Sequence, residues 1–325
     1  MKLPKIVNAA LVASAAIGFS SLAHAEYPDR AITLIVPYAP GGSVDAFARV
    51  IAPELEARLG KPVIVDNVPG AGGILGVAKS VRAQPDGYTI LLGIVSDVVL
   101  APLTESAARY TYRDLEPIAS LGTSGVGVVA NPALKITTLS ELIAYAKKNP
   151  GKLSYGSTGA GSLPALAMEE VKRRADIKIE FIPYASASKI AVDVMGGHLD
   201  VGVSGLPALI EPIKGGRLTG VGVLSADRDV GNDKLVSTKD TPELAGMDFY
   251  FWTGLFGPKG TPEPIVTKLN AAFADVLAQG KVKARFADYG VKISPATSPK
   301  DFGLFVAQSS KTWEQLVKQS GVPKN

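Results

Sequence analysis

Residues 32–45 read Ile32-Thr33-Leu34-Ile35-Val36-Pro37-Tyr38-Ala39-Pro40-Gly41-Gly42-Ser43-Val44-Asp45, an apolar strand pattern that passes through a glycine turn into a helical pattern. A similar stretch is Leu153-Ser154-Tyr155-Gly156-Ser157-Thr158-Gly159-Ala160-Gly161-Ser162. Glycines before a helix let backbone N–H groups point outward at an anion, and the helix dipole adds favourable potential there. Two such turns, separated by a domain's length of chain, predict a ligand held between two lobes. The alternative at each turn is a tight strand–helix connection that needs glycine only for its backbone geometry.

The first turn leads into an amphipathic helix pattern. Ser43 is predicted to be its N-cap, and Asp45 places a carboxylate in the first turn. Pro53 lies inside the pattern and is predicted to kink or divide the helix, because an interior proline costs ~3 kcal/mol. The apolar face at helical spacing consists of Val44, Phe47, Ala48, Ile51, Leu55 and Leu59.

Strand and helix patterns alternate from Ile32 onward. This alternation predicts an α/β protein whose parallel sheets carry helices on both faces. The strand candidates are 32–38, 63–66, 89–93, 126–130, 153–157, 179–183, 201–204, 218–224 and 251–256. The helix candidates are 44–59, 75–83, 139–148, 163–174, 189–195, 206–214, 265–277 and 302–319.

The first 25 residues have the pattern of a cleaved signal peptide. Lys2 and Lys5 precede an apolar stretch that ends near Leu22, and Ala23-His24-Ala25 is an A-x-A cleavage site. A membrane anchor is the alternative, but the stretch is rich in small residues and short for a ~20-residue span. We therefore expect an exported periplasmic protein that begins at Glu26 and does not insert into the membrane.

Composition excludes several functions. The chain has no cysteine, so it offers no disulfide, thiol nucleophile or N-terminal lipid attachment. Its formal charge of +4 includes Lys2 and Lys5 of the N-terminal segment. No basic run with interleaved aromatic residues occurs, so we expect no nucleic-acid partner.

Enzyme motifs are weak. Ser186-Ala187-Ser188-Lys189 fits S-x-x-K, but the companion K-T-G is missing, as are a G-x-S-x-G elbow and a Walker A motif. The glycines of 156–161 are spaced GxxGxG, which is not a dinucleotide fingerprint. After residue 25 the chain has one histidine, His198, so a Ser-His-Asp or transition-metal site is not expected. We predict no catalytic site, no metal and no cofactor.

Binding residues are easier to nominate. Hydroxyls near the second turn add donors for a carboxylate, and Asp97 follows a strand at a position from which it can reach a cleft. The alternative for Asp97 is a helix cap or a solvated side chain. A third turn, Val68-Pro69-Gly70-Ala71-Gly72-Gly73, lacks hydroxyls and is predicted to be a packing turn. The candidate ligand-binding residues are Tyr38, Ala39, Pro40, Gly41, Gly42, Ser43, Asp45, Ser96, Asp97, Thr158, Gly159, Ala160, Gly161, Ser162, Tyr184, Ser186 and Ser204.

These segments together resemble the solute-binding receptors of tripartite tricarboxylate transporters, also called Bug proteins. The resemblance covers essentially the whole chain after residue 25, and its order and spacing are specific. It is carried by Tyr27-Pro28-Asp29-Arg30, Pro37–Asp45, Val65–Gly73, Pro85–Thr89, Glu141–Lys148, Pro150–Leu153, Tyr155–Ser162, Pro183-Tyr184, Gly196-Gly197, Trp252–Leu255 and Gly260-Thr261-Pro262.

The resemblance implies a two-lobed type II periplasmic binding protein with a mainly parallel sheet in each lobe and the ligand in the interlobe cleft. It implies lobes of 26–124 plus 251–325 and of 125–250, joined by two crossing strands near 121–130 and 250–257. The loops matching Tyr38–Asp45 and Thr158–Ser162 would grip a small carboxylate, largely through backbone N–H groups. The expected protein is a monomer that delivers the carboxylate to a two-subunit membrane permease.

The chain departs from the family pattern where ligand identity is set. Ala185-Ser186 and Lys189-Ile190 replace the usual Lys-Gly and Pro-Ala pairs after Tyr184, and Ala165 replaces the usual histidine. Val95-Ser96-Asp97 replaces small and hydroxyl residues. An acid at 97 would favour a ligand with a donor or positive group opposite its carboxylate. Two other functions remain open, an exported serine hydrolase that uses Ser43 or Ser162 and a sensory receptor that docks on a histidine kinase.

Overall fold

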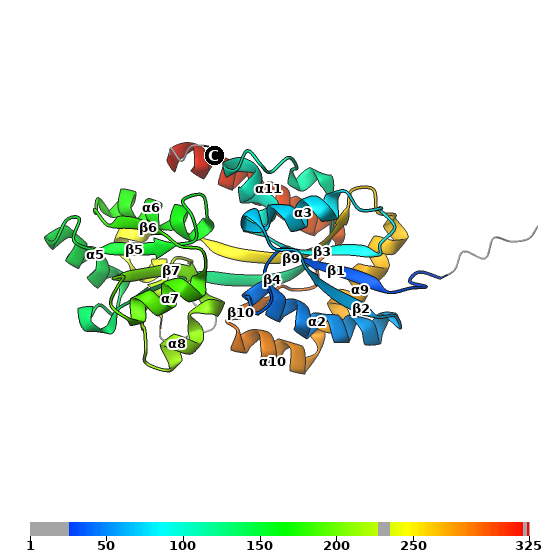
Figure 1. Ribbon diagram of the computed structural model, residues 1–325, viewed down its shortest axis with the longest axis horizontal. Helices are drawn as coiled ribbons and strands as arrows, with labels where there is room; N and C mark the ends of the chain where they lie inside the picture. Colours follow the sequence, from blue (N-terminus) through cyan, green and yellow to red (C-terminus); the bar gives the residue numbers. More distant parts are fainter. Residues whose placement is uncertain (1–25, 227–234, 321–323, 325) are drawn as a thin grey trace, which may run out of the picture.

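The computed structural model describes residues 26–226, 235–320 and 324. The expected signal peptide of residues 1–25 lies outside this part of the chain. Ten strands form one continuous, curled sheet in the order β2-β1-β3-β9-β4-β7-β5-β6, with β8 and β10 also pairing with β4. Figure 1 shows the strands passing through two lobes, with helices on both faces of the sheet.

The first lobe is built on parallel strands. β2 pairs with β1 and β1 with β3 in parallel, and β9 and β10 add antiparallel partners. Its strands are β1 (Ile32–Val36), β2 (Val63–Asn67), β3 (Thr89–Ile94), β9 (Tyr250–Pro258) and β10 (Val291–Ile293). Its helices are α2 (Ser43–Leu59), α3 (Ile74–Val81), α4 (Ala101–Thr104), α9 (Glu263–Ala278), α10 (Gly280–Asp288) and α11 (Pro299–Ser320).

The second lobe repeats the arrangement with its own parallel strands, β6-β5-β7. Its strands are β5 (Ser154–Ser157), β6 (Glu180–Pro183), β7 (Val201–Gly205) and β8 (Thr219–Val223). Its helices are α5 (Leu139–Lys148), α6 (Leu163–Ala175), α7 (Ala187–Met195) and α8 (Ile210–Lys214). The two-lobed α/β fold expected from the sequence is therefore present.

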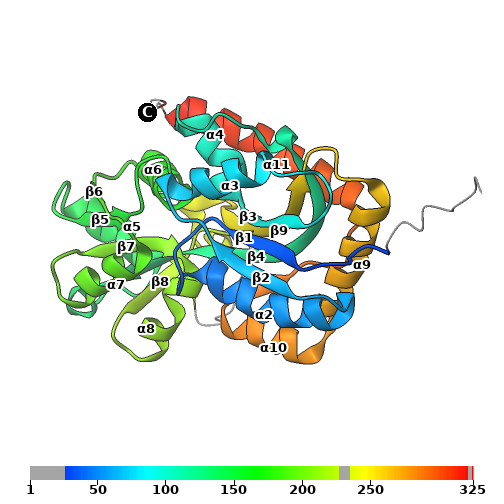
Figure 2. The same ribbon diagram turned by 45° about the vertical axis from the view of Figure 1, so that its right-hand side comes forward.

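One long strand joins the two lobes. In β4 (Leu115–Ala130), Leu115 to Gly125 pair with β9, and Val126 to Ala130 pair with β7. All strand pairs that involve β4 or β9 are antiparallel, so parallel pairing is confined to the flanks of the sheet. Figure 2 shows β4 and β9 at the centre of the molecule, between the lobes.

Helix α2 shows why this sequence folds locally as it does. Its predicted apolar face is buried from Val44 to Leu55 and partly buried at Leu59, and Gly60 ends the helix in a left-handed conformation with φ 71°. Pro53 does not divide the helix, because α2 runs unbroken from Ser43 to Leu59. Pro53 lies on the exposed face, where water can satisfy the carbonyl group that the proline leaves unpaired.

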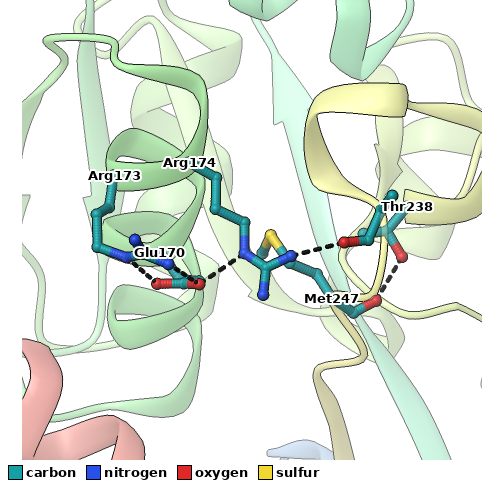
Figure 3. Close-up of polar contacts among 6 residues, drawn as sticks. Glu170, Arg173, Arg174, Thr238 and Met247 are labelled. Atoms are coloured by element: carbon teal, nitrogen blue, oxygen red, sulfur yellow. Dashed lines mark hydrogen bonds and ion pairs between the residues drawn. The ribbon is translucent and has the colours of Figure 1, made fainter.

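Polar contacts fasten α6 to the chain segment that returns to β9 (Figure 3). Glu170 accepts hydrogen bonds from Arg173 Nε and Nη2 at 2.7 Å and from Arg174 Nε at 2.6 Å. Arg174 Nη1 also donates to the carbonyl oxygen of Ala245 at 2.6 Å. In the returning segment, Thr238 Oγ1 donates to the carbonyl oxygen of Met247 at 2.6 Å.

The hydrophobic cores of the two lobes are continuous along one side only. A single buried cluster contains Ile74 and Val98 of the first lobe, Leu166 and Val171 of α6, and Trp313 of α11. On the opposite side each lobe has a separate core, one between the sheet and helices α2, α9 and α10, the other beneath α7. Helix α11 packs against α4, α6 and β4, so it contacts both lobes.

Candidate ligand-binding site

The strand register turns the two sets of parallel strands toward each other. Ile94 at the end of β3 pairs with Thr253 near the start of β9, so β1, β2 and β3 end toward the second lobe. Gly205 at the end of β7 pairs with Val126, where β4 has just entered the second lobe, so β5, β6 and β7 end toward the first. Carboxyl ends of parallel strands are the usual place for ligands in α/β folds. Both predicted glycine turns lie at these ends (Figure 1).

The turn after β1 presents the start of α2. Gly42 is the N-cap and Ser43 is the first helical residue, so the prediction that Ser43 caps the helix is wrong. Gly42 has the extended backbone conformation of an N-cap (φ −78°, ψ 170°), so the helix begins one residue earlier than predicted. Asp45 Oδ2 accepts the Gly41 N–H at 2.9 Å. The Ser43 and Val44 N–H groups lie in the first turn, where helix geometry provides no carbonyl partner. Those amides, rather than that of Gly41, are available to a ligand.

Asp45 holds this turn in place. Only 2% exposed, it accepts hydrogen bonds from Gly41 N, from Arg49 Nε at 2.9 Å and from Asn67 Nδ2 at 3.0 Å. Asn67 Nδ2 also donates to the Tyr38 carbonyl oxygen at 3.0 Å. Burial tends to raise the pKa of Asp45, but the hydrogen bonds from Arg49, Gly41 and Asn67 outweigh it and leave the pKa below its usual value. Asp45 therefore acts on the site by fixing the backbone around the turn.

The turn after β5 presents the start of α6. Gly159 has φ 85°, which favours glycine, and Ser162 is the N-cap, with its Oγ accepting the Ala165 N–H at 3.4 Å. The Ser157 and Ser162 hydroxyls are 3.2 Å apart. Pro164 lies in the first turn and has no N–H, so Leu163 is the helical residue whose amide stays unpaired there. Thr158 and Ala160 are exposed.

This second turn lies against the first lobe. A Cβ atom placed on Gly161 would be 2.9 Å from both Cβ and Oγ1 of Thr104. Thr104 is the last residue of α4 and is 3% exposed. The glycine turn of one lobe therefore touches a helix of the other, and only a residue without a side chain fits at that contact.

Asp97 is buried beneath the first-lobe loops. It is 0% exposed, its Oδ1 accepts the Ile94 N–H at 2.9 Å, and its Oδ2 has no hydrogen-bond partner among the described residues. Burial raises the pKa of Asp97 to about 8, although the Ile94 N–H and the nearby Tyr38 hydroxyl oppose the rise. Burial, together with Asp97, raises the pKa of Tyr38 well above its usual value. Neighbouring Ser96 is partly exposed, whereas neither carboxyl oxygen of Asp97 reaches the surface of this structure.

The remaining candidates lie at the ends of β6 and β7. Tyr184 donates its hydroxyl to Asp193 Oδ2 at 3.0 Å, and its ring packs over Gly156. Ser186 is the N-cap of α7, with its Oγ accepting the Lys189 N–H at 3.3 Å. Ser204 is 6% exposed and pairs with Gly127 in the sheet.

Sequence reasoning missed one contributor to this region. Asn67 ends β2 and binds both Tyr38 and Asp45, and an amide side chain at a strand end was the signal available for it. The third turn is predicted to be a packing turn, and its residues Gly70, Ala71, Gly72 and Gly73 all have positive φ. Gly73 lies directly over Asp97, and a Cβ there would be 2.9 Å from Asp97 Cβ.

Two small cavities lie outside this region. One, of about 150 Å³, lies between β4, α9 and residues 293–297, and the other, of about 160 Å³, between α6, Phe249 and α11. Neither cavity includes a residue of the two glycine turns. The candidate site is therefore inferred from the facing strand ends and helix N-termini of the two lobes. Within residues 26–226, 235–320 and 324, no three acidic or histidine side chains are grouped to hold a metal ion. No helix in those ranges is long and apolar enough to cross a bilayer.

Comparisons with known proteins agree with the two-lobed fold. Protein BugT of Bordetella pertussis is 33% identical over 91% of this chain and 90% of its own length. The structure of the periplasmic binding protein BugD is 29% identical with a TM-score of 0.81 and covers 92% of this chain and 100% of that one.

Two further solved structures contain carboxylates. An R. palustris protein with adipate is 26% identical with a TM-score of 0.84, covering 91% of this chain and 99% of that one. MatC from Rhodopseudomonas palustris with bound malate is 28% identical with a TM-score of 0.80, covering 90% of this chain and 100% of that one.

Neither the hydrolase nor the sensory alternative receives support. The Ser162 hydroxyl contacts the Ser157 hydroxyl and the Ala165 amide, neither of which is a base. The family and the fold are those of periplasmic solute-binding proteins. Residues 47–322 match the family model described as tripartite tricarboxylate transporter family receptor, and the chain belongs to that family.

Proposed function

We propose that this receptor binds a small carboxylate between the turn at residues 39–43 and the turn at residues 158–162. The ligand oxygens accept the unpaired N–H groups at the starts of α2 and α6, including those of Ser43, Val44 and Leu163. The observation that carries this proposal is the opposed pair of helix N-termini at facing carboxyl ends of the two sets of strands. The adipate and malate bound by relatives support the ligand class.

No cationic side chain is required in this arrangement. Each helix N-terminus contributes ~0.3–2 kcal/mol to anion binding, and each hydrogen bond to a charged group ~1.5–3 kcal/mol. Contacts from both lobes form together only when the lobes are closed. The ligand therefore shifts an open–closed equilibrium by its preference for the closed form.

The biological setting follows from the same proposal. Residues 1–25 are removed as a signal peptide, and the monomeric receptor delivers its ligand to a two-subunit membrane permease. The binding step itself involves no bond breaking, so the receptor is not an enzyme. The lobes comprise residues 26–124 plus 251–325 and residues 125–250, which is supported by the pairing of Gly125 with Tyr250 where β4 changes partners.

Replacing Ser43 by proline removes a single backbone donor. Proline is tolerated at the first helical position, and the preceding Gly42 has φ −78° and ψ 170°, an extended conformation compatible with a following proline. We expect Ser43→Pro to keep its fold and to bind adipate or malate about tenfold to a hundredfold more weakly, as loss of one charge-assisted hydrogen bond implies. Isothermal titration calorimetry on the protein from residue 26 onward measures this change.

The matched control is Ser43→Ala, which keeps the N–H and removes the hydroxyl. We expect it to bind the same carboxylates as the unchanged protein does. A thermal-shift screen of mono-, di- and tricarboxylates, aromatic acids and amino acids chooses the probe ligand. Binding that is equally weakened by both substitutions, or unaffected by Ser43→Pro, contradicts the proposed backbone grip.

A further inference from the structure

Three loops of the first lobe meet at one buried carboxyl group. The loop after β1 brings the Tyr38 hydroxyl beside Asp97, and the turn after β2 places Gly73 against Asp97 Cβ. The loop after β3 contains Asp97 itself, whose Oδ1 accepts the Ile94 N–H at 2.9 Å. The Tyr110 hydroxyl fixes the backbone here by donating to the Asp97 carbonyl oxygen at 2.7 Å.

The turn above Asp97 needs such support. Ala71 has φ 46° although it is not glycine, and it lies between Gly70 and Gly72, which also have positive φ. A non-glycine residue in this conformation persists only when its surroundings impose it. Gly73 is the buried residue of the turn and packs tightly against Asp97. Through this contact Asp97 stabilises the backbone conformation of the exposed Ala71.

We propose that Asp97 is a positioning residue that holds the loops after β1 and β2 in their binding geometry only while its carboxyl group is protonated. This rests on the proposed function, because the loop after β1 is half of the proposed carboxylate grip. It assigns to Asp97 a role that acts through Tyr38 and Gly73, with no direct contact to the ligand.

The chemistry of the surroundings explains why the uncharged form is the one that fits. A protonated carboxyl group needs one donor for its carbonyl oxygen, which Ile94 supplies, and it can donate through its other oxygen. An ionised group would keep its full charge at a site that is 0% exposed, where the Ile94 N–H and the nearby Tyr38 hydroxyl do not offset the cost of burial. The titratable side chains that face Asp97 are Tyr38 and Tyr110, which are both neutral at ordinary pH because burial raises their pKa values.

The first test needs no ligand. Hydrogen–deuterium exchange of the peptide covering residues 68–77 is compared between the unchanged protein and Asp97→Asn at each pH, so that the intrinsic pH dependence of exchange cancels. Asparagine cannot ionise and can still accept and donate. Because burial holds the pKa of Asp97 at about 8, we expect equal protection at pH 6 and about tenfold faster exchange in the unchanged protein one to two units above that pKa.

Asp200→Asn is the matched control, because Asp200 is a partly buried carboxylate that binds Ser154 in the second lobe. We expect its exchange in residues 68–77 to follow the unchanged protein at every pH. Equal protection of the unchanged protein and Asp97→Asn across pH 6–10 would overturn the proposal. So would loosened exchange of Asp97→Asn at pH 6, since the isosteric amide would then fail to replace the acid.

The second test measures adipate affinity over the same pH range. We expect the unchanged protein to lose affinity above pH 8 by about tenfold per pH unit, and Asp97→Asn to keep its affinity there. If no carboxylate binds at any pH, the proposed function fails while the exchange test still decides the role of Asp97. If adipate binds and its affinity in the unchanged protein is flat to pH 10, the positioning role is wrong and the carboxylate grip stands.

Discussion

Asp45 and Asp97 are both buried in the first lobe, yet their surroundings move their pKa values in opposite directions. Asp45 accepts three hydrogen bonds, one of them from an arginine, so its charge is compensated. Asp97 accepts the Ile94 N–H through Oδ1 and has the Tyr38 hydroxyl nearby, but no cation among the described residues compensates the burial of its charge. The two pKa values differ because the two carboxyl groups have different hydrogen-bond donors. The sequence does not show this difference, because both residues are aspartates.

Replacing Asp45 by alanine should destabilise the protein and disorder the first turn. The change leaves Gly41, Arg49 and Asn67 without their acceptor, and loss of such a buried partner costs about 1–3 kcal/mol. Urea unfolding at pH 7 measures the free energy of unfolding. The control is Asp66→Ala, which removes the more exposed ion pair with Lys79 and should change stability by less than ~1 kcal/mol. Equal effects of the two substitutions would contradict the role given to Asp45.

Asp97 should make the stability of the protein fall with rising pH. Its pKa is raised to about 8 in the folded protein and lies near ~3.9 in the unfolded chain. Between these values the folded state binds more protons, so the free energy of unfolding declines by up to ~1.4 kcal/mol per pH unit. Urea unfolding at pH 5, 6, 7 and 8 should show this decline in the unchanged protein relative to Asp97→Asn. A constant difference between the two proteins would show that Asp97 is ionised throughout.

Single-residue chemistry was partly readable from the sequence. The glycines of both turns and the acid at 45 were identified by type and spacing. Asp97 was expected to reach a cleft, but the structure buries it, because Gly73 from a distant turn packs over it. Contacts of that kind join residues far apart in the chain, so spacing along one segment does not predict them.

Among the elements, the helices and strands with strong periodicity were predicted well. Helix α9 and helix α11 extend the predicted patterns by one to three residues at each end. Helix α10 and strand β10 were not predicted, because Gln279 alone separates α10 from α9 and β10 has only three residues. β4 begins at Leu115, earlier than expected, since its register irregularities near Pro117 and Ser120 obscure the alternation.

The contact between the second glycine turn and α4 can be tested by a double-mutant cycle. Gly161→Ala should destabilise the protein by about 1–3 kcal/mol, because the new methyl group would lie 2.9 Å from Thr104 Cβ. Thr104→Gly removes the obstructing side chain at the last position of α4. Urea unfolding of both single variants and the double variant measures the coupling. We expect the double variant to be more stable than the sum of the two single effects predicts. If the effects simply add, the two residues are not in contact.

For the whole molecule, the two separated glycine turns predicted two lobes, and the family resemblance implied how the chain divides between them. Alternating strands and helices predicted α/β layers, but not that β4 would serve both lobes. The role of α11 was also hidden, because an amphipathic pattern shows that a helix is packed without showing which lobes it touches. In the structure, Trp313 of α11 packs against Phe249 with ring centroids 5.5 Å apart.

Replacing Trp313 by alanine should loosen the connection between the lobes. Trp313 is 6% exposed, and removal of such a side chain costs about 3–5 kcal/mol. We expect a lower free energy of unfolding and, in ligand-free protein, a larger radius of gyration by small-angle X-ray scattering. Leu304→Ala on the exposed face of the same helix, where the side chain is 61% exposed, should change neither quantity appreciably. An unchanged radius of gyration in Trp313→Ala would mean that α11 does not restrain the lobes.

The one-sided continuity of the hydrophobic core has a consequence for solute traffic. Separating the lobes along the rim formed by α4, α6 and α11 would expose apolar side chains to water, whereas α2 and α7 belong to independent cores. Hinge bending should therefore be asymmetric. The lobes should separate on the side of α2 and α7 and stay in contact on the side of α4, α6 and α11. Solute would enter and leave the cleft on the side of α2 and α7, and a membrane partner that accepts the solute would have to face that side.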